Sequence, residues 1–198
     1  IHAARSQKAL NGIIVCYSLS DLVYQDEIEF SNQAWNLKKK LQEINDLFGT
    51  TELPVYIIFT KVDLLTGFNE YFHRFDKTKI DQILGISFPQ KNNSGQQTNV
   101  DLFENQFDSI GSYLRKMSFG LLQRERNELK RAFILEFPEE FMSLKKKIYS
   151  FLSEIFSKNR FENNLFLRGV YFASAGSLGM AIDPIGMESS YQYSYNSD

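Results

Sequence analysis

The residues best suited to chemistry follow a short apolar run. The run is Leu53-Pro-Val-Tyr-Ile-Ile-Phe59, and Thr60, Lys61 and Asp63 come directly after it. An ionised carboxylate such as that of Asp63 only accepts hydrogen bonds, through two oxygens. It can therefore accept a pair of hydrogen bonds from the ring N–H and the exocyclic amine of guanine, a donor pair that adenine lacks. The aliphatic stem of Lys61 can cover the flat face of a base while its ammonium stays in water. These residues are a candidate site for a purine base.

A second candidate segment follows another apolar run. Leu167-Arg-Gly-Val-Tyr-Phe-Ala173 is followed by Ser174 and Ala175. Thr60-Lys-Val-Asp63 resembles the base-specificity motif of P-loop GTPases, usually Asn-Lys-x-Asp with Thr as a variant of its first residue. Ser174-Ala175 resembles the GTPase loop whose backbone N–H contacts the guanine oxygen. The plainer interpretations, a polar loop after a strand and a turn of small residues, remain open.

The phosphate-binding half of such a site is missing from the chain. No glycine is followed by lysine, so there is no Gly-x-x-x-x-Gly-Lys-Ser/Thr loop. Asp108-Ser-Ile-Gly111 and Asp183-Pro-Ile-Gly186 match the switch pattern Asp-x-x-Gly, but both come after Asp63, in the wrong order, and we treat them as coincidence. Without a phosphate loop and a magnesium-holding hydroxyl, a chain cannot position a γ-phosphate for transfer. We therefore predict no catalytic residue and no hydrolysis by this chain alone.

The elements that must position these residues alternate between strand and helix patterns. Gly12-Ile-Ile-Val-Cys-Tyr-Ser-Leu19 predicts a strand buried on both faces. A helix is then indicated by apolar residues at intervals of four and three, and the strand before Thr60 follows. This βαβ unit predicts a parallel sheet, and ligands of such sheets bind at the carboxyl ends of strands. The helical stripe consists of Phe30, Ala34, Leu37, Leu41, Ile44 and Phe48.

A long helical region separates the two candidate segments. Asp63 and Ser174 lie 111 positions apart, whereas one helix with its loops needs roughly thirty. The spacing predicts a helix from Phe103 that continues to about Phe133, a break at Phe137-Pro138, and another helix from Phe141.

The predicted fold class is α/β, a partial P-loop GTPase-like parallel sheet of three strands with a large inserted helical subdomain. Residues 1–74 are predicted to hold the first two strands and the base motif, and residues 75–160 the helical subdomain. Residues 161–186 are predicted to hold the last strand and base loop, and residues 187–198 a disordered tail.

The bulk composition excludes several classes of function. With 22 basic and 24 acidic residues, the net charge is −2, which gives no reason to expect nucleic acid as a partner. Cys16 is the single cysteine and His2 and His73 are the two histidines, so no metal-ligand cluster is predicted. The sequence contains no run of about eighteen apolar residues, the length that a membrane-spanning helix needs. It also contains no recognisable signal peptide. The chain begins with Ile1 rather than Met, so we expect it to be a piece of a longer protein.

Several blocks of the sequence resemble the IcmF/TssM family of secretion-system proteins. Asn11-Gly-Ile-Ile-Val-Cys-Tyr-Ser-Leu-Ser-Asp-Leu22 is similar to a strand of that family, and so is the block from Leu53 to Phe72, with its Thr-Lys-Val-Asp-Leu-Leu-Thr-Gly-Phe. Leu167-Arg-Gly-Val-Tyr-Phe-Ala-Ser174 resembles a third block. The match covers about residues 11–180. It departs at Ala175-Gly-Ser-Leu-Gly179, where the family usually has Gly-Thr-Gln-Glu-Gly.

The resemblance implies a piece of the cytoplasmic NTPase-like domain of an inner-membrane protein from a type IVB or type VI secretion system. It implies membrane helices outside this chain, a phosphate loop upstream, and a DotU/TssL-type partner among other secretion components. GTP or ATP with Mg²⁺ would bind only with those upstream residues. Abundant Lys, Asn, Ile and Phe would suit the AT-rich genome of a Legionella-like organism, which favours the type IVB version.

Three hypotheses remain open at this point. The chain is a structural, partner-binding segment with half of a base site, part of an active GTPase or ATPase that powers or gates the complex, or an unrelated α/β domain. The helical region is either a docking surface for the DotU-type partner or only a cover for the sheet.

Overall fold

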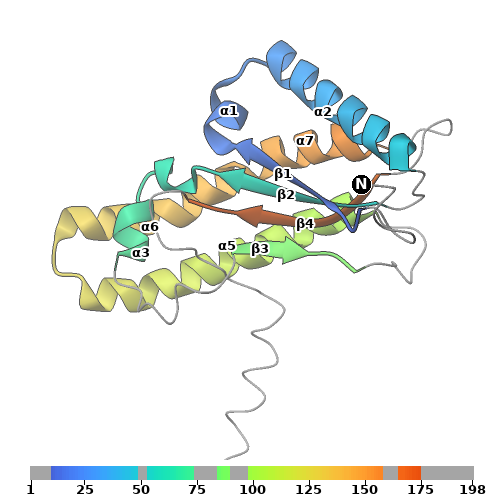
Figure 1. Cartoon of the computed structure of the whole chain (residues 1–198). Helices are drawn as coiled ribbons and strands as arrows, with labels where there is room; N and C mark the ends of the chain where they lie inside the picture. The colour runs from blue at the N-terminus through green and yellow to red at the C-terminus, as the bar shows by residue number, and fades with distance from the viewer. Residues whose placement is uncertain (1–9, 49–52, 74–83, 90–97, 158–164, 175–198) are drawn as a thin grey trace, which may run out of the picture.

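The computed structural model describes residues 10–48, 53–73, 84–89, 98–157 and 165–174. Its centre is a four-stranded sheet with the order β1-β2-β4-β3 (Figure 1). Strands β1 (Ile13–Ser18), β2 (Pro54–Thr60) and β4 (Phe166–Phe172) are parallel, which confirms the predicted α/β class and the parallel pairing of the three expected strands.

One strand was not predicted. β3 (Leu84–Ser87) pairs antiparallel with β4, within the range that the sequence assigned to helices. A strand of four residues is too short for the alternation of apolar and polar residues to be recognised, so the sequence did not indicate it. Tertiary contacts hold this strand, because Leu84 and Ile86 are each 2% exposed and lie in the core.

Helices connect the strands. α1 (Leu19–Tyr24) and α2 (Glu27–Phe48) lie between β1 and β2, and the short helices η1 (Val62–Leu64) and α3 (Phe68–Phe72) follow β2. α5 (Asn99–Arg124), α6 (Glu128–Ser143) and α7 (Lys145–Phe156) lie between β3 and β4. α5 packs on both α6 and α7, and α2 packs on α7. In the part of the chain that the structure describes, none of these helices is long and apolar enough to cross a membrane.

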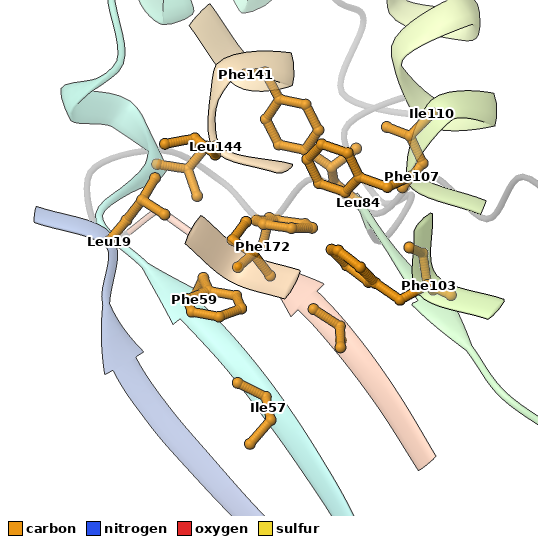
Figure 2. Close-up of a cluster of buried hydrophobic side chains, with 14 of the residues drawn as sticks. Leu19, Ile57, Phe59, Leu84, Phe103, Phe107, Ile110, Phe141, Leu144 and Phe172 are labelled. Carbon is orange, nitrogen blue, oxygen red and sulfur yellow. The ribbon is translucent and has the colours of Figure 1, made fainter. Parts of the chain in front are cut away.

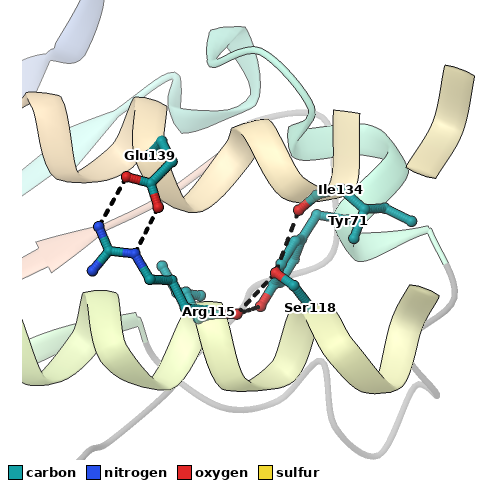
Figure 3. Close-up of polar contacts among 6 residues, drawn as sticks. Tyr71, Arg115, Ser118, Ile134 and Glu139 are labelled. Atoms are coloured by element: carbon teal, nitrogen blue, oxygen red, sulfur yellow. Dashed lines mark hydrogen bonds and ion pairs between the residues drawn. The ribbon is translucent and has the colours of Figure 1, made fainter. Parts of the chain in front are cut away.

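The predicted helix boundaries in this region were wrong. The chain breaks at residues 125–127 rather than near Phe133, because the Asn127 side chain accepts from the Lys130 N–H and caps the start of α6. Pro138 lies inside α6 instead of ending it. A proline cannot donate to the carbonyl four residues earlier. That carbonyl, of Ile134, instead accepts a hydrogen bond from the Ser118 hydroxyl of α5 at 3.4 Å (Figure 3).

The sheet and the helices share one hydrophobic core. Phe172 of β4 lies near its centre, with ring centroids 5.7 Å from Phe59, 5.9 Å from Phe107 and 4.9 Å from Phe141 (Figure 2). Burying one such side chain contributes about 1.5–3 kcal/mol. The core thus joins β2 and β4 to α5 and α6 directly.

Candidate functional site

The carboxyl ends of β1, β2 and β4 lie side by side. Ser18 is in register with Thr60, and Phe59 with Phe172. Beyond the strands, the Ala173 N–H donates to the Phe59 carbonyl at 2.8 Å, and the Val62 N–H donates to the Ala173 carbonyl at 3.2 Å. These backbone hydrogen bonds join the segments after β2 and β4, and so bring the two candidate base segments together.

Asp63 and Ser174 are in direct contact. The Ser174 hydroxyl donates to Oδ1 of Asp63 at 2.7 Å, across 111 positions of sequence, and both side chains are partly buried. The bond restrains the orientation of the carboxylate. A carboxylate has two oxygens and about four acceptor positions, so this bond uses only part of the acceptor capacity of Asp63.

Lys61 adopts a strained backbone conformation. Its φ of 64° and ψ of 35° are left-handed, and among the described residues it is the one non-glycine residue with positive φ. Such a conformation costs about 1–3 kcal/mol and often occurs at ligand sites. The side chain is exposed, and Nζ lies 3.5 Å from the Ser20 hydroxyl. The turn therefore leaves Lys61 at the surface beside the partly buried Asp63.

Thr60 and the serines of β1 and α1 complete the strand ends. The Thr60 hydroxyl donates to the Tyr17 carbonyl at 3.3 Å, which ties β2 to β1. Ser18 and Ser20 share a hydrogen bond of 2.6 Å between their hydroxyls. The sequence analysis had not placed these serines at the site, although their position after the first parallel strand was a usable signal. Ala175, the remaining predicted site residue, lies outside the described residues, as do Asp183–Gly186 and the predicted tail.

The side chain of Tyr17 joins β1 to α2 and α7, and its hydroxyl keeps its proton at neutral pH. Its hydroxyl donates to Oε1 of Gln33 at 2.7 Å, and its ring packs 4.4 Å from that of Phe151. Burial raises the pKa of Tyr17 to about 12, and the nearby charges of Asp21 and Glu29 add to the shift. Across the described ranges, no three His, Cys, Asp or Glu side chains gather closely enough to hold a metal ion.

Known proteins resemble the chain along its length. The family model described as "IcmF-related N-terminal domain" matches residues 1–198. The "Type VI secretion system component TssM1" of Pseudomonas aeruginosa is 28% identical over 179 residues, which are 90% of this chain and 16% of that relative. The chain therefore spans about a sixth of the relative's length. No solved structure gives a significant match. On the full-length match to the family model, the chain belongs to the IcmF-related N-terminal domain family.

Proposed function

We propose that this chain is a cytoplasmic segment of an IcmF/TssM-type inner-membrane protein that stabilises a secretion apparatus, together with a DotU/TssL-type partner. Membership of the family and the name of the type VI relative support this proposal. Membrane association would come from parts of the protein outside residues 1–198.

The strand ends carry half of a nucleotide-binding site in this proposal. The observation that supports it best is the hydrogen bond from Ser174 to Asp63, since it joins the two segments that resemble GTPase base motifs. Asp63 would accept from the ring N–H and amine of guanine, and the stem of Lys61 would cover the base. The sheet is then part of a P-loop GTPase-like fold, in which residues 75–160 are an inserted helical subdomain.

The alternative is that the chain is part of an active GTPase or ATPase that powers or gates the complex. The same strand ends would serve it. It requires a phosphate loop and a magnesium-holding hydroxyl from another part of the polypeptide, because the sequence of residues 1–198 has no such loop. The chain by itself acts as a scaffold in both versions.

The test is a titration with fluorescent GTP, ATP and xanthosine triphosphate (XTP) of the longer polypeptide that includes residues before Ile1. Guanine has an amine where xanthine has a carbonyl oxygen. The amide of an asparagine can donate to that oxygen, whereas a carboxylate cannot. The Asp63→Asn variant should therefore bind GTP more weakly and XTP more tightly than the unmodified protein. A site built to hydrogen-bond an N–H of its ligand discriminates against a ligand that lacks this group by roughly 10⁴-fold or more. Glu43→Gln, the same kind of change at an exposed position of α2, is the matched control and should bind like the unmodified protein. Equal nucleotide binding by Asp63→Asn and the unmodified protein would exclude Asp63 as the base reader.

The outer side of α5 and α6 is the surface we propose for the DotU/TssL-type partner. The inner side covers the sheet, whereas Phe119 and Leu129 are 66% and 73% exposed. Phe119→Ser and Leu129→Ser should reduce co-purification with the partner, while Ile28→Ser on α2, at 76% exposure, should not. Loss of the partner after removal of only the upstream phosphate loop would argue against this surface.

A further inference from the structure

The two faces of the sheet differ in how they are covered. On one face, Val55, Ile57 and Phe59 of β2 are fully buried under the helices. On the opposite face, Ile14 is 66% exposed and Cys16 is also exposed. In Figure 1 the strands lie in front of α5 and α7, so the view is onto this second face, which we call the open face.

The open face is apolar. The parallel register places Ile14 beside Tyr56 and Cys16 beside Ile58, and Ile58 lies beside Tyr171. None of these five residues belongs to the hydrophobic core or packs against it. A sheet face that stays in water carries mostly polar side chains, whereas parallel sheets are normally covered on both faces. Two isoleucines and two tyrosines side by side are therefore typical of a face that becomes buried.

The open face is also flat. The ring of Tyr171 lies across Gly169 and Gly85. A Cβ atom at Gly169 would come within 2.6 Å of the Tyr171 ring, and one at Gly85 would collide with it as well. The Tyr171 hydroxyl is 2.9 Å from that of Ser87, which holds the ring down on the strands. A flat apolar platform suits the close packing of an amphipathic helix.

We infer that an amphipathic helix from another segment of the same, longer polypeptide covers the open face and packs on Ile14, Ile58 and Tyr171. The chain spans 16% of the length of its type VI relative, so polypeptide for such a cover exists in that protein. β1 is an edge strand of the described sheet, which leaves room for a further strand that would bring the helix with it. The inference goes beyond the proposed function and does not depend on nucleotide binding.

Cys16 is a natural probe for this cover. In the native longer polypeptide, alkylation of Cys16 by N-ethylmaleimide should be at least roughly tenfold slower than after unfolding in urea, as followed by mass spectrometry of the Cys16 peptide. The control is the cysteine introduced by Ser109→Cys on the exposed side of α5, which should react at similar rates in both conditions. In the 198-residue chain alone, Cys16 should react quickly.

A second variant tests the contact itself. Ile14→Arg should speed the alkylation of Cys16 in the native longer polypeptide, whereas Ile28→Arg, at a comparably exposed position of α2, should not. Cys16 reacting as fast in the native longer polypeptide as in urea would overturn the inference, whether or not the Ile14 variant folds. Protection of the 198-residue chain that rises with its own concentration would assign the face to a second copy. Protection that requires a separate protein would assign it to a partner.

Discussion

At the scale of single residues, the buried hydroxyl of Tyr71 links α3 to α5. Tyr71 is fully buried, and its hydroxyl donates to the Leu114 carbonyl at 2.6 Å (Figure 3). Burial raises the pKa of Tyr71, so the hydroxyl keeps its proton and remains a donor. The Ser118 hydroxyl also lies 3.1 Å from this carbonyl and 3.4 Å from that of Ile134, so its single proton is shared between the two.

Tyr71→Phe should lower the free energy of unfolding by about 1 kcal/mol. The ring would stay in place, but the hydrogen bond to Leu114 would be lost. The loss stays moderate because Ser118 still satisfies that carbonyl. Tyr24→Phe removes the same hydroxyl at a position that is 85% exposed, and should change stability by less than about 0.5 kcal/mol. Urea unfolding of the three proteins measures both values, and equal effects at the two positions would show that the Tyr71 hydrogen bond contributes little.

The sequence identified the types of the candidate site residues but not their geometry. Thr60, Lys61, Asp63 and Ser174 were recognisable because they follow apolar runs. Their contact could not be predicted, since it depends on how the chain between residues 63 and 174 folds back. The left-handed backbone of Lys61 was also invisible, because lysine has no preference for that conformation.

At the scale of elements, a glycine sets how closely α3 approaches α6. Gly67 precedes α3 with a φ of 79°, and a Cβ atom there would collide with the Phe133 carbonyl oxygen. The left-handed conformation alone costs an L-residue about 1–2 kcal/mol, and the clash with backbone adds to it.

Gly67→Ala should therefore destabilise the chain by more than about 2 kcal/mol. Gly120→Ala is the matched control, because Gly120 lies inside α5 and a Cβ atom there would have no neighbour within 4 Å. That variant should be more stable by about 0.5–1 kcal/mol, since alanine restricts the unfolded chain and favours the helix. Thermal unfolding followed by circular dichroism gives both signs. An unchanged stability in Gly67→Ala would contradict the close approach of Gly67 to the Phe133 carbonyl. A loss of stability in Gly120→Ala would contradict the open space around Gly120.

Helix and strand boundaries show where local patterns stop being informative. A proline normally ends or kinks a helix, and the sequence predicted a break at Phe137-Pro138. The helix continues, and the Ile134 carbonyl that Pro138 cannot pair with instead faces the hydroxyl of Ser118, which is 16 positions away and on another helix. β3 likewise depends on its partner β4. Both features come from contacts between elements, whereas the predicted β1, β2 and β4 were visible from their own apolar runs.

At the scale of the whole molecule, the shared hydrophobic core is relevant to whether the chain folds as one domain or as a sheet with a separate helical subdomain. The sequence predicted residues 75–160 as an inserted helical subdomain. Phe107 and Phe141, from that range, pack on Phe172 of the sheet, and Phe107 also stacks on Phe141 with ring centroids 4.9 Å apart. Apolar patterns in a sequence indicate that each helix has a buried side, but not whether that side faces the sheet or another helix.

Because of this shared core, the sheet and the helical layer should unfold together. The single tryptophan, Trp35 on α2, reports on the β1–β2 side of the molecule, and Phe119→Trp in a Trp35→Phe background reports on α5. Both positions are exposed, at 58% and 66%, so the changes themselves should have little effect on stability. Fluorescence of the two proteins should give the same urea midpoint, as a single cooperative unit requires. Phe172→Leu, which weakens the contact between the layers by about 1–2 kcal/mol, should lower both midpoints equally. Two separate midpoints, or a shift at only one probe, would instead establish residues 75–160 as an independently stable subdomain.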